Sequence, residues 1–143
     1  MLMNYKKDND LAELGKKVIE SYPEFEALQY CRIGYLYADK EKKVKNKTVY
    51  ADTEKLSDKM KALVPLDFVI TFYKPSCRNL TPDRMEILMY HELRHVGYDA
   101  TDGTCSILPH DLEDFKDIVD KYGTDWIIKR GTEKGDKLNE DNN

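Results

Sequence analysis

The stretch LTPDRMEILMYHELRHVG, residues 80–97, decides how the rest of the chain is interpreted. It contains HELRH at residues 91–95, an H-E-x-x-H pattern. Residues four apart lie on the same face of a helix, so the two imidazoles can reach one metal ion. Neutral imidazole is a good ligand for Zn²⁺, and a glutamate between such histidines suits a general base. The motif therefore predicts His91 and His95 as zinc ligands and Glu92 as a base acting on water.

The residues around the motif predict that it lies on a helix. Thr81 is a favoured N-cap, and Pro82 suits the first helical position. Gly97 stands where a glycine in the left-handed conformation would end the helix. At about 100° per residue, the apolar side chains form one arc, with the histidines and Glu92 on or beside it. That arc comprises Met85, Leu88, Met89, Leu93 and Val96, and the opposite face carries Asp83, Glu86, Tyr90 and Arg94.

A catalytic zinc site needs a third protein ligand and one open position. The chain has 3 histidines, and the one outside the motif is His110. Pro109 restricts the backbone just before it, and a helix expected over residues 111–122 would hold it in place. The rival ligands are Glu113 on that helix and, less favoured, Asp99 and Asp102, which belong to the loop after the motif. Tyr98 in the same loop is the candidate for an added electrophile.

Composition indicates a single domain, expected over residues 1–130, with a disordered tail over residues 131–143. The 143 residues are 41% hydrophobic and 35% charged, with a net charge of −4, so a nucleic-acid partner is not expected. We see no apolar run of membrane-spanning length and no secretory h-region, so we expect a cytoplasmic protein without a membrane partner. The 3 cysteines form no C-x-x-C pair, which favours reduced thiols, and Cys105 is expected to be a small buried residue more often than a ligand.

The rest of the chain predicts further helices and strands. The strongest strand is DFVITFYK at residues 67–74, nearly all of it strand formers. Other expected elements are a helix at 8–21, a strand at 27–37, a lysine-rich turn at 38–47 and a returning strand at 48–51. Residues 52–63 are expected to be a short helix or an extended connection, and residues 98–109 a loop with an extended piece at 105–108. We expect the lysines of the turn to be a solvated hairpin tip.

Three segments in this order resemble the phage metallopeptidases, a small zincin-like family: DFVITFY at 67–73, HELRHVG at 91–97 and HDLEDF at 110–115. The resemblance covers about residues 29–115. It implies an α+β fold, a minimal zincin-like domain in which a small mixed or antiparallel sheet accompanies an active-site helix and flanking helices. It also implies His91, His95 and His110 as ligands and Glu92 as base, and a phage or prophage origin. It does not identify a substrate.

The expected function is therefore a zinc-dependent metallopeptidase acting on a peptide or protein substrate. One alternative is a binding or regulatory protein that keeps the zincin fold without proteolysis and acts on a host or phage protein. The intact Glu92 argues against that reading. A second alternative is a zinc amidase acting on a cell-wall peptide. Such enzymes usually need export, for which we find no signal, although a phage can supply another exit route.

Overall fold

The computed structural model describes residues 2–110. By its internal contacts the chain divides into two compact units, Met1–Pro109 and His110–Asn143, and the description below concerns the first unit and His110. The helix expected at 111–122 and the tail expected at 131–143 lie outside the described residues, so the predicted domain boundary stays a prediction. The elements are β1 (Tyr5–Lys7), α1 (Asn9–Ser21), the 3₁₀ helix η1 (Pro23–Tyr30), β2 (Ile33–Ala38), β3 (Lys42–Val44), β4 (Lys47–Val49), β5 (Ala51–Lys55), α2 (Asp58–Lys61), β6 (Phe68–Tyr73), α3 (Lys74–Cys77), α4 (Pro82–Arg94), β7 (Val96–Asp99) and β8 (Thr104–Ile107).

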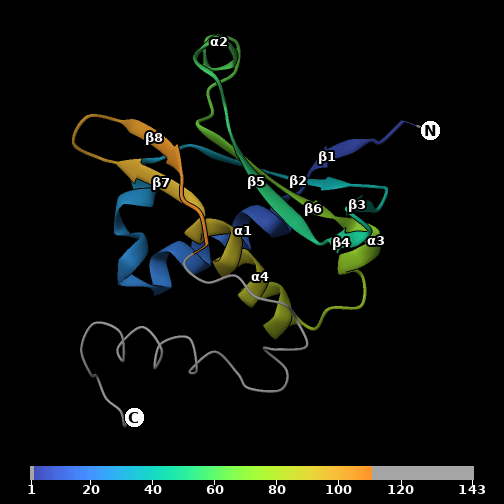
Figure 1. Ribbon diagram of the computed structural model, residues 1–143. Helices are drawn as coiled ribbons and strands as arrows, with labels where there is room; N and C mark the ends of the chain where they lie inside the picture. Colours follow the sequence, from blue (N-terminus) through green and yellow to red (C-terminus); the bar gives the residue numbers. More distant parts are fainter. Residues whose placement is uncertain (1, 111–143) are drawn as a thin grey trace, which may run out of the picture. The chain divides into compact units, whose positions relative to one another are not determined.

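The main sheet is mixed and has four strands in the order β1-β2-β6-β5. Strand β2 is parallel to β6, whereas β1 and β5 run antiparallel to their neighbours. The strongest predicted strand is confirmed as β6, which lies inside the sheet and buries Phe68, Ile70 and Phe72 completely. With helices packed on this sheet, the predicted α+β fold is confirmed (Figure 1).

Helices α1 and α4 pack against each other on the same side of the sheet (Figure 1). The predicted first helix is confirmed as α1, which begins where the Asp8 carboxylate accepts a hydrogen bond from the Leu11 N–H at 3.0 Å. At Gly15 this helix approaches the sheet so closely that a Cβ would lie 2.3 Å from the Tyr35 hydroxyl oxygen. The absence of a side chain at that position lets α1 pack closely against β2. Helix α1 in turn packs against α4.

Helix α4 confirms the helix predicted around the motif, with one error at its end. The Thr81 Oγ1 accepts a hydrogen bond from the Arg84 N–H at 3.2 Å, as expected for an N-cap. Gly97, however, is not a left-handed C′ residue, because the helix is capped at His95 and the chain enters β7 directly. A Cβ at Gly97 would lie 2.3 Å from the Ser106 Oγ of the paired strand. The glycine therefore serves close strand packing instead of helix termination.

Two other predictions need correction. Residues 27–30 belong to η1 and not to the strand predicted at 27–37, because Pro23 starts a helical turn that buries Phe25 and Leu28 on one side. The lysine-rich segment is itself a hairpin of β3 and β4, closed by Lys45 and Asn46 at φ 52° and 63°. The predicted returning strand therefore pairs within this hairpin instead of with β2, whose partners are β1 and β6.

The segment after α4 folds into a second hairpin, β7–β8. The extended piece predicted at 105–108 is confirmed as β8, and its partner β7 begins just after the helix. This hairpin carries the chain away from His95 and back again, so that Leu108 returns to the end of α4. No helix within the described residues is long and apolar enough to cross a membrane.

Candidate metal centre

The two motif histidines lie one helical turn apart on α4, as the sequence predicts. Their ring centroids are 5.1 Å apart, and the rings are steeply inclined to each other at 72°. Helix α4 is fixed by Met89 and Leu93, which are fully buried, so the histidines stand on a rigid element. His91 is exposed and His95 half-buried, so both side chains are at least partly accessible to solvent.

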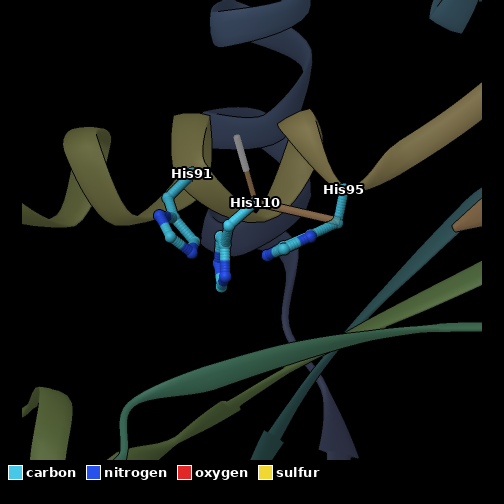
Figure 2. A group of neighbouring side chains, drawn as sticks. All are labelled: His91, His95 and His110. Atoms are coloured by element: carbon cyan, nitrogen blue, oxygen red, sulfur yellow. The ribbon is translucent and has the colours of Figure 1, made fainter. Parts of the chain in front are cut away.

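His110 lies with the other two histidines. One ligand-capable atom from each ring can be chosen so that all three lie within 4.8 Å of one another. Figure 2 shows the rings of His91, His95 and His110 gathered beside α4. Tetrahedral zinc with bonds of about 2.0–2.1 Å holds such nitrogens roughly 3.3 Å apart, a spacing below the 4.8 Å within which the three atoms lie. The donor set of three imidazoles therefore fits zinc.

The backbone of Leu108 fixes both the position and the tautomer of His95. The Leu108 carbonyl oxygen lies 2.7 Å from His95 Nδ1, and the Leu108 N–H donates to the His95 carbonyl at 2.8 Å. A carbonyl oxygen only accepts, so Nδ1 is the donor in this hydrogen bond and Nε2 is the ring nitrogen that could bind a metal. The same pair of hydrogen bonds anchors the end of the β7–β8 hairpin two residues before His110.

Glu92 is 4% exposed and is attached to the edge of the main sheet. The Thr53 hydroxyl of β5 lies 2.8 Å from Glu92 Oε1 and 3.1 Å from the Glu92 carbonyl oxygen, and these two acceptors share its single proton. The side chain thus has a neutral donor that restricts its orientation. Sequence analysis missed Thr53, because a threonine on a strand is ordinary and its partner lies 39 residues away.

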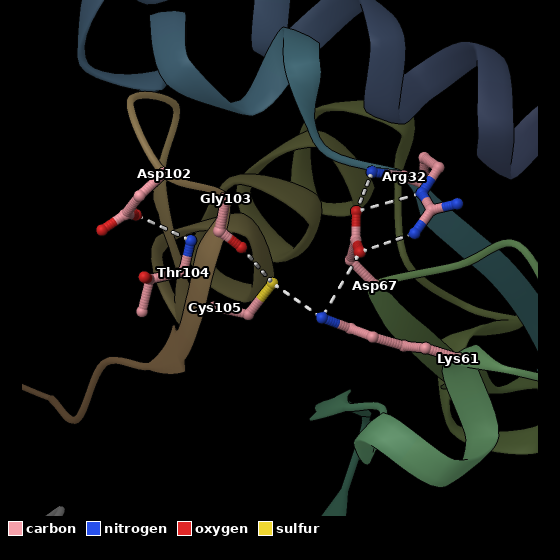
Figure 3. Close-up of polar contacts among 7 residues, drawn as sticks. All are labelled: Arg32, Lys61, Asp67, Asp102, Gly103, Thr104 and Cys105. Atoms are coloured by element: carbon pink, nitrogen blue, oxygen red, sulfur yellow. Dashed lines mark hydrogen bonds and ion pairs between the residues drawn. The ribbon is translucent and has the colours of Figure 1, made fainter.

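A second polar cluster holds the β7–β8 hairpin to the rest of the fold (Figure 3). Asp67, 6% exposed, accepts from the Arg32 backbone N–H at 2.8 Å and from its guanidinium at 3.0 Å. The hydrogen bond from Arg32 is the main cause that lowers the pKa of Asp67. Lys61 lies 3.6 Å from Asp67 and 3.4 Å from the Cys105 sulfur on β8. Cys105 is therefore engaged with Lys61 and is not a member of the histidine cluster.

The remaining candidates lie elsewhere on the hairpin. Asp99 and Asp102 accept backbone hydrogen bonds from Thr101 at 2.9 Å and Thr104 at 3.0 Å, so both shape the turn. The Tyr98 hydroxyl lies 3.9 Å from where a Cβ would stand on Gly103, towards the closed end of the hairpin. The histidines lie at its open end, so this position gives no support for Tyr98 as the electrophile. Glu113 lies outside the described residues.

The fold and the histidine cluster define a candidate metalloprotein of mixed α and β structure. A family model described as "Putative phage metallopeptidase" matches residues 3–135. The chain belongs to this family, as the sequence resemblance predicted. The family description indicates a metal-dependent peptidase. Neither a curated protein nor a solved structure matches the chain.

Proposed function

We propose that the protein is a zinc-dependent metallopeptidase in which Glu92 is the general base. The observation that carries this proposal is the gathering of His91, His95 and His110 around one space, with Glu92 next to the first of them on α4. Zinc, when bound, supplies Lewis-acid chemistry that polarises a carbonyl and makes water more acidic. The three imidazoles would hold the ion and leave a position open for water and substrate.

Glu92 would move the protons of the reaction. Its carboxylate would take a proton from the attacking water and pass it to the leaving amine, the usual work of a positioned carboxylate. The Thr53 hydroxyl donates to Oε1 at 2.8 Å and would help to orient the carboxylate for this work. The burial of Glu92 fixes its rotamer, so the base would need little reorganisation before reaction.

A peptide is the substrate that the surroundings of Glu92 favour. Strand β5, which carries Thr53, is at an edge of the main sheet. Exposed sheet edges can pair with an extended peptide through backbone hydrogen bonds. A peptide added along β5 would therefore pass close to the proposed base and its neighbouring histidine.

The test compares metal-free, zinc-loaded and chelator-treated protein on an unbiased peptide library, with cleavage read by mass spectrometry. We expect cleavage only with zinc and restoration when zinc is added after chelation. His91→Ala should bind zinc weakly and cleave nothing, whereas Arg94→Ala on the same helix serves as a folded control. Zinc-loaded protein that cleaves no library peptide would contradict the proposal and favour a binding role. Hydrolysis of muropeptides but of no library peptide would show that the protein is an amidase acting on cell-wall peptides.

A further inference from the structure

A pocket of about 700 Å³ opens beside the histidines, entirely within Met1–Pro109. One wall is the exposed face of α4, and the other is the segment that joins β4 to β5. His91 and Glu92 form part of this lining, so the pocket is continuous with the proposed catalytic centre. Its other lining residues are Thr48, Val49, Tyr50, Ala51, Leu80, Arg84, Ile87 and Leu88.

The pocket exposes apolar side chains to solvent. Ile87 is 66% exposed and Tyr50 is 44% exposed, although both are large and apolar. Leu80 and Leu88 continue this surface while packing partly against the core. Exposed apolar surface next to a polar site is typical of a place where a ligand is bound. A substrate side chain seated here would cover Ile87 and Tyr50.

Arg84 adds a positive charge to the same pocket. It lies seven residues before His91 on α4, which is two turns and therefore the same face of the helix. Its side chain is exposed, and among residues 2–110 it makes none of the ion pairs that hold other basic side chains. Seven residues span about 10.5 Å along a helix, and an extended peptide covers this distance in about three residues.

We propose that this pocket selects peptide substrates that carry a large apolar side chain beside the scissile bond and a carboxylate about three residues away. The apolar side chain would rest on Ile87, Leu88 and Tyr50. The carboxylate would pair with the guanidinium of Arg84, which suits planar oxygen pairs. This inference rests on the proposed peptidase function for its catalytic part, but the binding preference has a separate measurement.

The first test uses matched fluorogenic peptides with one leucine beside the cleaved bond and Glu, Gln or Lys placed three residues away on either side. We expect kcat/KM for the better Glu peptide to exceed that for the Lys peptide by about fivefold or more, as for a partly exposed ion pair, and the ratio to fall in high salt. A further pair of peptides ends three residues from the cleaved bond, one with a free C-terminus and one with an amidated C-terminus. This pair tests whether the carboxylate at the end of a chain is recognised as well as that of a side chain. In Arg84→Gln the Glu-to-Lys ratio should approach one.

Arg94→Gln is the matched control, because it removes the same charge from the last turn of α4 at a residue that does not line the pocket. It should retain the Glu preference of the parent. A parent enzyme that cleaves all the peptides equally, or an Arg84→Gln variant that keeps the full preference, would overturn the inference while leaving the peptidase function intact.

Ile87→Ala tests the apolar part of the pocket. Because Ile87 is largely exposed, its truncation should leave the fold and zinc binding unchanged. We expect the ratio of kcat/KM for leucine over alanine beside the scissile bond to fall about threefold or more, in line with lost burial of a few methylene groups. An unchanged ratio would remove Ile87 from the site.

Binding separates this inference from the proposed function. Fluorescence anisotropy with the same peptides and zinc-loaded Glu92→Gln protein measures recognition without turnover. Tighter binding of the Glu peptide, lost in Arg84→Gln, would support the pocket even if no peptide were hydrolysed by the parent. Equal binding of the Glu and Lys peptides would overturn it.

Discussion

Glu92 and Asp67 are both buried carboxylates, exposed by 4% and 6%, but they are held in opposite ways. Asp67 lies between two cations, Arg32 and Lys61, and also accepts a backbone hydrogen bond. Glu92 accepts from the neutral hydroxyl of Thr53 and lies next to a cluster of imidazoles. The chain thus contains one buried acid placed to bind cations of its own fold and one placed beside a candidate metal centre.

The surroundings of Asp67 make it unsuitable as a base. Its hydrogen bond from Arg32 and the nearby positive charges lower its pKa, so it holds its negative charge and accepts no proton near neutral pH. Glu92 accepts a hydrogen bond from the neutral hydroxyl of Thr53, and such a bond orients a carboxylate. The comparison therefore assigns a structural role to Asp67, and substitutions can test this role and the role proposed for Glu92.

Glu92→Gln should have the largest effect. The amide keeps the size of the side chain but cannot accept a proton, so we expect peptide hydrolysis to fall by about 10²–10⁴-fold. Zinc content, measured by atomic absorption, should match that of the parent. Loss of zinc from this variant would show that Glu92 binds the metal or anchors the site, and the contrast with Asp67 would then be wrong.

His110→Ala should weaken zinc binding by more than about 100-fold, since it removes a ligand and not merely a group that orients one. Competition with a chromogenic chelator gives the affinity. Glu113→Ala is the comparison variant, because it removes the rival carboxylate, and it should bind zinc as tightly as the parent. Should the two results be exchanged, the centre would have two histidines and one glutamate as ligands.

Asp67→Asn should lower the free energy of unfolding by about 2 kcal/mol at neutral pH, because a hydrogen-bonded buried charge is lost. The folded-state pKa of Asp67 is lowered, so its contribution is present above the unfolded-state value of about 3.9 and disappears as the pH falls through the folded-state value. Urea titrations of parent and variant should therefore converge below about pH 4. The kcat of the folded variant should match the parent's, and a large fall in kcat would contradict a structural role.

Thr53→Val should have the smallest effect of the four. It keeps the shape of the side chain and removes the donor to Glu92 Oε1, so we expect kcat to fall by about tenfold, the cost of one hydrogen bond to a charged group, with KM and zinc content unchanged. Thr53→Ser restores a hydroxyl and should recover most of the activity. Equal activity in the valine and serine variants would mean that Glu92 is oriented by other contacts.

Local signals in the sequence predicted the parts of the site that depend on neighbouring residues. The N-cap Thr81 and the four-residue spacing of His91 and His95 were sufficient to predict α4. The scarcity of histidine pointed to His110, which the structure places with the other two.

Long-range pairing explains what the sequence did not reveal. Thr53 meets Glu92 only because β5 lies at the edge of the sheet next to α4, and no local pattern reports that contact. Gly97 follows a helix, as a terminating glycine does, yet its role is to admit the Ser106 side chain of the paired strand. The β3–β4 hairpin was not predicted, because Lys45 and Asn46 adopt positive φ and the turn lacks the glycine that usually indicates such a conformation.

The two hydrogen bonds between His95 and Leu108 also bear on how the chain tolerates changes in length. At 2.7 and 2.8 Å, they hold the two ends of the β7–β8 hairpin together beside the candidate metal centre. Residues inserted in the exposed turn around Gly103 would then lengthen the hairpin at its closed end without moving His110. A doubled loop costs only about 0.6 kcal/mol in closure entropy. We therefore expect this turn to tolerate a change in length, and an inserted tag there to leave the candidate site undisturbed.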